Sequence, residues 1–185
     1  SPVWDTAICA IALAESGLKR DHPFLVRACN WLVSKEIKIR GDWKVKRPKA
    51  PAGGWAFEFE NQHYPDIDDT AMVILALRRI ALTNISDQTA CEQSILRGLN
   101  WLLTMQGRDG GWAAFDVDNN KQIFTQVPFA DHNALLDPSC ADITARILET
   151  LGSLGYDLSY PEIQKGIKFL KKHQEPDGSW FGRWG

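Results

Sequence analysis

Three carboxylates stand within four residues of this sequence, at Asp66, Asp68 and Asp69. Crowded carboxylates cannot all ionise at low cost, so one of them tends to keep its proton at neutral pH. A helix that begins here would favour the anionic form of the same groups, because its N-terminus carries partial positive charge. The cluster therefore combines a retained proton with a tendency to release it, as a general acid for a difficult protonation requires.

Two other interpretations of the cluster stay open from the residues alone. One aspartate before an apolar helical run is a common N-cap, a role we expect for Asp5 in the first repeat, so the surplus carboxylates need another explanation. Several aspartates could also bind Mg²⁺ with a diphosphate, but no basic phosphate-binding stretch accompanies them. The segment 116–120 resembles a calcium loop, yet Lys121 and Val127 replace its glycine and its closing glutamate. We therefore predict no metal site.

Other catalytic patterns are missing from the sequence. It contains no Gly-x-Ser-x-Gly, phosphate loop or dinucleotide fingerprint, and its four histidines are scattered. The four cysteines form no Cys-x-x-Cys pair and fall in apolar helical patterns, so we expect them to be reduced and packed in the core. They are Cys9, Cys29, Cys91 and Cys140.

The composition describes an ordered globular protein. The 185 residues are 44% hydrophobic and 24% charged, with a formal net charge of −2. The chain has no basic stripe, so we predict no nucleic-acid partner, and no apolar run long enough to span a bilayer. Because the chain starts at Ser1 without a methionine, we expect it to be a piece of a longer enzyme.

Three internal repeats organise the chain. Each carries an apolar helix, a glutamine or glutamate, and a Gly-x-Trp turn. The repeats run from Arg27 through Glu36 to Trp43, from Arg97 through Gln106 to Trp112, and from Lys165 through Gln174 to Trp180. A second set of helical runs, Ile8 to Leu18, Met72 to Leu82 and Arg146 to Leu154, follows Asp5, Asp69 and Asp142. Two helices per repeat predict inner and outer layers, so we expect an all-α toroid of about three helix pairs.

Local signals complete this prediction. Gly17, Gly152 and Gly155 are expected to stop helices. The glutamine of each repeat should hydrogen-bond backbone groups while the indole stacks on it, which would link neighbouring helices without taking part in chemistry. The loops 44–65 and 116–138 are longer than connectors need to be, so we expect them to shape a site.

The sequence Asp-x-Asp-Asp-Thr-Ala at residues 66–71 resembles a motif of squalene–hopene cyclases, and the repeated Gln…Gly-x-Trp pattern resembles their QW motif. Further segments, among them residues 1–6, 53–57, 115–119 and 178–185, are similar to segments of the same family. The resemblance covers the whole chain. It implies that residues 1–185 form part of the α/α-barrel catalytic domain of a larger two-domain enzyme, peripheral or monotopic on the cytoplasmic side of a membrane.

The resemblance also implies an activity. Such an enzyme protonates a terminal double bond of squalene and closes five rings to hopene or hopanol, with no metal or organic cofactor. By this match Asp68 is the proton donor, and Asp66 and Asp69 tune its acidity. Membrane contact would come from parts of the enzyme outside these residues, and the resemblance allows a homodimer. We expect residues 1–185 alone to be inactive.

Aromatic side chains would surround the carbocation, because ring faces stabilise positive charge without acting as nucleophiles. The positions that match are Trp4, Phe57, Phe115 and Trp184. Phe115 stands where related enzymes carry tyrosine, so a hydroxyl is lost. Arg146 stands where some carry histidine, and its charge would lower the pKa of the acid by pairing with a flanking carboxylate. Asp142, one helical turn earlier, would hold Arg146 in place.

Two alternatives to this function remain. The chain could belong to another protonation-initiated cyclase that acts on a diterpenyl diphosphate or a different linear polyprene. It could also be a non-catalytic toroid that binds prenyl groups, although such a protein would not need three clustered acids.

Overall fold

The structure is a computed structural model that describes residues 1–57, 63–118 and 137–183. Within these ranges the chain forms six α-helices and one short 3-10 helix, and no residue of them belongs to a β-strand. They fall into two compact units, Ser1–Thr104 and Met105–Gly185. The predicted all-α fold class, built from helix pairs, is confirmed. No described helix is both long and apolar enough to cross a membrane.

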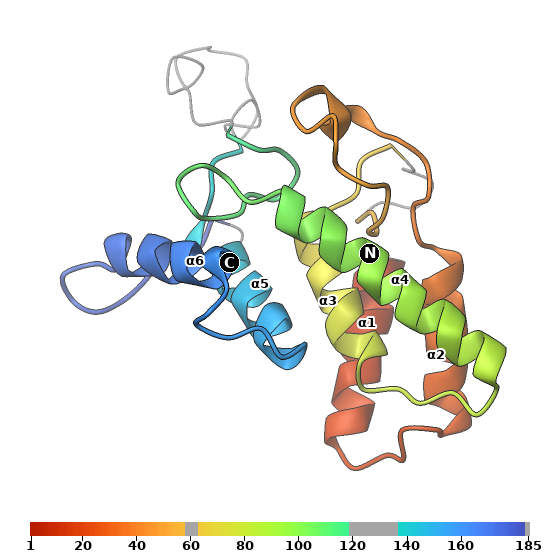
Figure 1. The fold of residues 1–185 in the computed structure, drawn as a ribbon. Helices are drawn as coiled ribbons and strands as arrows, with labels where there is room; N and C mark the ends of the chain where they lie inside the picture. The colour runs from red at the N-terminus through yellow and green to blue at the C-terminus, as the bar shows by residue number, and fades with distance from the viewer. Residues whose placement is uncertain (58–62, 119–136, 184–185) are drawn as a thin grey trace. The chain divides into compact units, whose positions relative to one another are not determined.

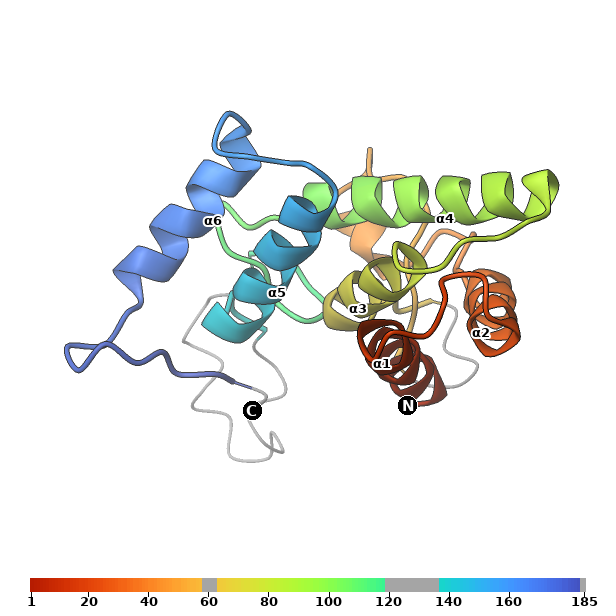
Figure 2. The ribbon, with the colours of Figure 1, turned by 90° about the horizontal axis from the view of Figure 1, so that it is seen from below.

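Unit 1 contains two helix pairs, α1 (Pro2–Glu15) with α2 (Pro23–Ser34) and α3 (Ile67–Leu77) with α4 (Ile85–Thr104). Helix α1 packs on α3 and α2 packs on α4, so the helices form two layers (Figure 1 and Figure 2). The 3-10 helix η1 (Asp42–Val45) lies in the loop between α2 and α3. This layering agrees with the inner and outer helices predicted from the repeat.

Helix α3 is the central element of unit 1, and all of its residues except Asp68 are buried. From Ala71 to Leu77 it carries only apolar side chains, and such a helix is stable only when it is surrounded. Helices α1, α2 and α4 provide that surrounding. The first turn of α3 is therefore held within the packed interior of the unit.

Helix α1 begins before the predicted residue. Ser1 is its N-cap, and the Ser1 hydroxyl accepts a hydrogen bond from the amide of Trp4 at 3.4 Å. Pro2 follows at the first helical position, where its missing amide hydrogen costs nothing. Asp5 lies exposed in the first turn, so the prediction that it caps this helix is wrong.

Unit 2 contains one helix pair, α5 (Ala141–Ser153) and α6 (Pro161–Lys172), which pack against each other. Gly155 follows α5 with a φ of +90°, and Gly17 follows α1 with a φ of +93°, so both predicted helix stops are confirmed. Gly152 lies inside α5, and its prediction as a stop is wrong. The helix continues through it because a helical glycine costs only about 1 kcal/mol relative to alanine.

All four cysteines are free thiols, and three of them are buried. Cys29 on α2 and Cys91 on α4 place their sulfur atoms 3.5 Å apart, between the two outer helices of unit 1. Core packing is therefore confirmed for Cys29, Cys91 and Cys140. It is wrong for Cys9, which is exposed on α1.

The turn of the second repeat ties its own segment together and also reaches the next helix. The Gln106 side-chain amide donates to the carbonyl of Gly110 at 2.9 Å, and the Gly107 backbone amide donates to the carbonyl of Gly111 at 2.8 Å. Gln106 also donates to the carbonyl of Glu162 on α6 at 3.0 Å. The predicted linking role of this glutamine is confirmed.

The third repeat makes the same turn at the end of α6. The Gln174 side-chain amide donates to the carbonyl of Gly178 at 2.9 Å, and the Trp180 indole donates to the carbonyl of Leu170, also at 2.9 Å. Trp180 is 47% exposed, whereas the corresponding tryptophans of the other turns are fully buried.

The first repeat closes at Trp55 and not, as predicted, at Trp43. The amide of Ile37 donates to the carbonyl of Gly54 at 2.9 Å, and the Trp55 indole donates to the carbonyl of Leu32 at 2.7 Å. The first bond matches that of Gly107 with Gly111 in the second turn, and the second bond matches that of the Trp180 indole in the third. Trp43 lies in the inserted 3-10 helix η1, where a Gly-x-Trp sequence occurs by coincidence, so sequence spacing alone selected the wrong tryptophan.

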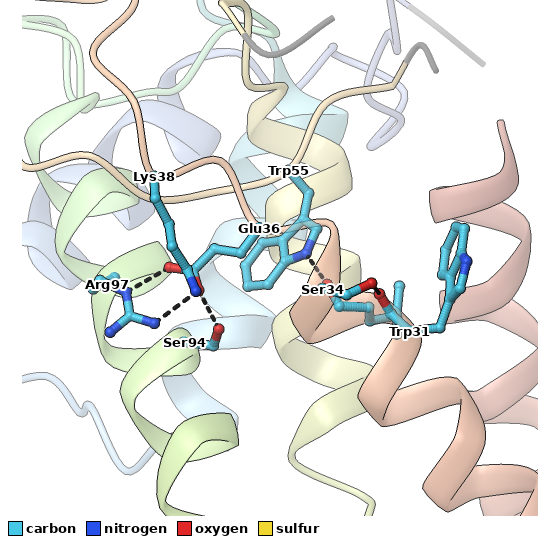
Figure 3. A network of polar contacts seen from close by, with 8 residues as sticks. Trp31, Ser34, Glu36, Lys38, Trp55, Ser94 and Arg97 are labelled. Atoms are coloured by element: carbon cyan, nitrogen blue, oxygen red, sulfur yellow. Dashed lines mark hydrogen bonds and ion pairs between the residues drawn. The ribbon is translucent and has the colours of Figure 1, made fainter. Parts of the chain in front are cut away.

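Glu36 occupies the glutamine position of this first turn (Figure 3). Its side chain accepts hydrogen bonds from the next helix, whereas the glutamine of the second turn donates one. Its carboxylate accepts two hydrogen bonds from Arg97, at 2.6 and 2.8 Å, and one from the Ser94 hydroxyl. Lys38 lies 3.8 Å away. A buried carboxylate needs donors, and α4 supplies them at the place where α6 offers a carbonyl to Gln106.

A glycine in the next helix accommodates each buried tryptophan. A Cβ atom at Gly98 of α4 would lie 2.9 Å from the Trp55 ring, and one at Gly166 of α6 would lie 3.3 Å from the Trp112 ring. Trp55 and Trp112 are both fully buried. The close approach of turn and helix therefore depends on the missing side chain.

We expect Gly98→Ala to lower the free energy of unfolding by about 1–3 kcal/mol, because the added methyl group overpacks a rigid, buried indole. Urea unfolding followed by tryptophan fluorescence measures the change. The control is Gly152→Ala, where a Cβ atom meets nothing within 4 Å. Equal effects of the two substitutions would contradict the proposed contact.

Candidate active site

The carboxylate cluster forms the first turn of α3. Asp66 is the N-cap, and its Oδ1 atom accepts a hydrogen bond from the amide of Asp69 at 2.8 Å. Asp66 is 5% exposed and Asp69 is 2% exposed, whereas Asp68 is half-buried. Asp68 is therefore the least buried residue of the three, although its Oδ1 atom is itself buried.

The tryptophan turn fixes the position of this helix start. The amide of Asp66 donates to the carbonyl of Trp55 at 2.8 Å, and the amide of Trp55 donates to the Thr70 hydroxyl at 2.9 Å. That hydroxyl donates in turn to the carbonyl of Asp66 at 2.7 Å. The three bonds form a closed, buried network, so the cluster cannot shift without breaking the turn.

The same network occurs in unit 2 with one change. The amide of Trp112 donates to the Thr144 hydroxyl at 3.0 Å, and the amide of Cys140 donates to the carbonyl of Trp112 at 3.0 Å. Cys140 thus takes the place of Asp66, and Asp142 takes the place of Asp68. Among the helix starts that the structure describes, only that of α3 in unit 1 carries three clustered carboxylates.

Burial is the main cause of the acid–base behaviour of the two flanking groups. It raises the pKa of Asp66 to about 8, and the negative charges of Asp69 and Asp68 add to the effect while the amide bonds oppose it. Burial and then repulsion from Asp68 raise the pKa of Asp69 to about 7, against the lowering effect of Ser1. The cluster therefore holds protons at neutral pH, mainly because of burial and only in part because of the crowding from which the sequence predicts it.

Asp142 and Arg146 lie one helical turn apart on α5, and both are half-buried. The Cys140 thiol hydrogen-bonds to Asp142, and a Cβ atom at Gly182 would lie 3.3 Å from the Asp142 carboxylate. These residues belong to unit 2 and Asp68 belongs to unit 1. The pairing of Arg146 with the acid cluster stays a prediction.

The predicted aromatic residues lie on different segments of the chain. Trp4 is half-buried in the first turn of α1, three residues after Ser1, whose side chain lowers the pKa of Asp69. Phe57 follows the Trp55 turn and is 48% exposed. Phe115 of unit 2 is 44% exposed. Trp184 lies outside the described residues.

Sequence reasoning missed two residues that hold the site. Thr70 was assigned only to a helix start, although its hydroxyl joins the turn to the cluster. Asp137 was assigned to a long loop, although its buried carboxylate binds the Phe115 segment. The recurrence of threonine at Thr144 was a usable signal for the first, but nothing in the sequence distinguished the second.

Neither a metal site nor the described pocket coincides with the cluster. Among the described residues no group of three histidine, cysteine, aspartate or glutamate side chains is arranged to hold a metal ion. A pocket of about 320 Å³ lies in unit 1, away from the predicted site residues. It is lined by Val33, Lys38, Ala52, Ala90, Gln93 and Arg97.

Helix pairs closed by turns that end in tryptophan, with an acid cluster at the start of an inner helix, indicate an all-α domain of the terpene cyclase class. The chain belongs to the squalene-hopene cyclase C-terminal domain family, whose model matches residues 1–185.

Individual relatives are similar over the whole chain. Identity is 45% over 185 residues to a squalene–hopene cyclase of Alicyclobacillus acidocaldarius and 45% over 193 residues to one of Schizosaccharomyces japonicus. It is 46% over 194 residues to the dammaradiene synthase of Dryopteris crassirhizoma. Each comparison covers 100% of this chain but only 28–29% of the relative.

The raised pKa values predict a pH-dependent stability. Between the ordinary value of 3.8 and the folded values near 8 and 7, the native state binds more protons than the unfolded chain. The free energy of unfolding therefore falls as pH rises through this window, by about 1.4 kcal/mol per pH unit for each group.

Asp66→Asn removes one of these groups but keeps an oxygen that can cap α3. Between pH 5 and pH 7 we expect the variant to lose less stability than the wild type, by about 1.4 kcal/mol per pH unit. Urea unfolding at several pH values measures the slopes. The control is Asp21→Asn, an exposed residue, which should keep the wild-type slope. A wild-type slope in Asp66→Asn would contradict the buried proton.

Proposed function

We propose that these residues form part of a squalene–hopene cyclase that protonates squalene and closes it to hopene or hopanol. The observation that carries the proposal is the acid cluster of α3, in which two buried carboxyl groups with raised pKa values flank the half-buried Asp68. Membership of the cyclase family and the similarity to two squalene–hopene cyclases support the same substrate.

The reaction follows from this arrangement. Asp68 gives its proton to a terminal carbon–carbon double bond, so that an O–H bond breaks, a C–H bond forms and a tertiary carbocation results. At neutral pH the buried carboxyl group of Asp66, with a pKa of about 8, is mostly protonated, and that of Asp69, with a pKa of about 7, is about half protonated. The negative charge beside the donor is therefore smaller than three ionised carboxylates would give. Successive double bonds then attack the cation, and loss of a proton gives hopene while addition of water gives hopanol.

Aromatic rings stabilise the positive charge as it moves. Trp4 and Phe57 of unit 1 and Phe115 of unit 2 keep part of their rings exposed, which a ring face needs in order to meet a cation. Trp184 is assigned the same role only because the sequence resembles the cyclase family. The complete enzyme would add the second domain, the membrane contact on the cytoplasmic side and any homodimer interface.

The similarity to a dammaradiene synthase favours a second candidate. At 46% identity this relative matches the chain as well as the squalene–hopene cyclases do. The same acid could therefore start a cyclisation that ends in a different triterpene. Incubation of the full-length enzyme with squalene, followed by mass-spectrometric identification of the products, separates the two functions.

Asp68→Asn in the full-length enzyme should lower squalene turnover by about 100-fold or more, because the amide cannot supply the proton of a general acid. Product formation under saturating squalene measures the loss. Asp157→Asn, at an exposed loop position, is the matched control and should keep wild-type turnover. Near-wild-type activity of Asp68→Asn would rule out the assigned donor.

Arg146→Gln tests the tuning of the acid by a neighbouring cation. Removing the positive charge should raise the pKa of the donor, so kcat should fall while the high-pH limb of the rate profile moves to higher pH. The control is Lys171→Gln, which removes an exposed charge from α6. An unchanged pH profile would show that Arg146 does not act on the acid.

A further inference from the structure

The buried side chain of Asp137 binds the backbone on both sides of Phe115. One carboxylate oxygen of Asp137 accepts a hydrogen bond from the amide of Ala114 at 3.1 Å. The other accepts from the amides of Phe115 at 2.6 Å and Asp116 at 2.7 Å. Asp137 is 9% exposed. Three consecutive amides thus point at a single acceptor, with Phe115 in the middle.

This arrangement leaves the segment little freedom. Hydrogen bonds to a carboxylate are short and roughly twice as strong as neutral ones. The side chains of Ala113 and Val117, which flank the segment, are 3% and 2% exposed, so both ends are anchored in the interior. Between them the Phe115 ring keeps 44% of its surface exposed. The ring is therefore presented outward on a backbone that cannot turn.

The repeat fold itself does not require this carboxylate. Asp66 and Cys140 hold equivalent positions in the two units, so the residue that corresponds to Asp137 in unit 1 is His63. His63 is exposed, whereas Asp137 is buried. Burying a carboxylate costs free energy that three amides must offset. A function specific to the Phe115 segment accounts for that cost.

We propose that Asp137 is a positioning residue that holds the Phe115 ring toward the carbocation and so governs how far the cyclisation proceeds. This inference rests on the proposed function. A ring face stabilises a cation only in a narrow range of distance and orientation. When the ring turns away, the intermediate cation loses a proton to water earlier, a double bond forms, and a product with fewer rings is released.

The test compares Asp137→Asn with Phe115→Leu in the full-length enzyme supplied with squalene. Both should raise the ratio of incompletely cyclised to fully cyclised products by roughly 2- to 30-fold, the factor that the loss of one cation–π interaction produces. The double variant should resemble Phe115→Leu alone, because Asp137 acts through the ring. Asp137→Glu, which keeps the charge but moves the carboxylate by one methylene group, should shift the products in the same direction.

Asp118→Asn is the matched control. Asp118 binds Arg108 by bonds of 2.8 and 3.1 Å and lies two residues beyond the last of the three amides that Asp137 accepts from. It should leave the product ratio unchanged. A product ratio unchanged in both Asp137 variants would overturn the inference while leaving the proposed function intact. A wild-type enzyme that forms no cyclised product from squalene would overturn both.

Discussion

The hydroxyl group of a threonine in the first turn of an inner helix is the contact on which the site depends. The Thr70 hydroxyl accepts a hydrogen bond from the amide of Trp55 and donates one to the carbonyl of Asp66, so one side chain joins the turn to the helix start. The Thr144 hydroxyl accepts a hydrogen bond from the amide of Trp112 in the same way. Buried backbone groups cannot be left without partners, and the hydroxyl can both accept and donate in this confined space.

The same contact explains how three carboxylates can be crowded together. Because hydrogen bonds hold the turn in place, the first backbone amides of α3 point at the Asp66 carboxyl group. Their hydrogen bonds offset part of the free energy that burial of this group costs. The remaining cost appears as raised pKa values at Asp66 and Asp69. A looser helix start would let water enter, and the protons would be lost.

A constant scaffold carries different chemistry in its two units. Cys140 replaces Asp66 at the start of α5, so unit 2 has the same network without the acid cluster. Unit 2 instead places a buried carboxylate, Asp137, behind an exposed aromatic ring. Glu36 shows a third change, since it reverses the hydrogen bond that Gln106 makes and recruits Arg97. Each change leaves the helix pairs in place.

The sequence by itself determined the helix pairs, the turns at Trp112 and Trp180, and the location of the acid cluster, because these depend on local periodicity and residue order. It could not determine which tryptophan closes the first repeat. Trp43 and Trp55 both end a Gly-x-Trp sequence, and only tertiary contacts distinguish them: the Trp55 indole donates to the carbonyl of Leu32 and packs against Gly98. The tertiary structure alone showed that Asp68 is the least buried residue of the cluster and that Asp137 binds the Phe115 segment. Both depend on burial and on contacts between residues distant in the sequence, which no local pattern records.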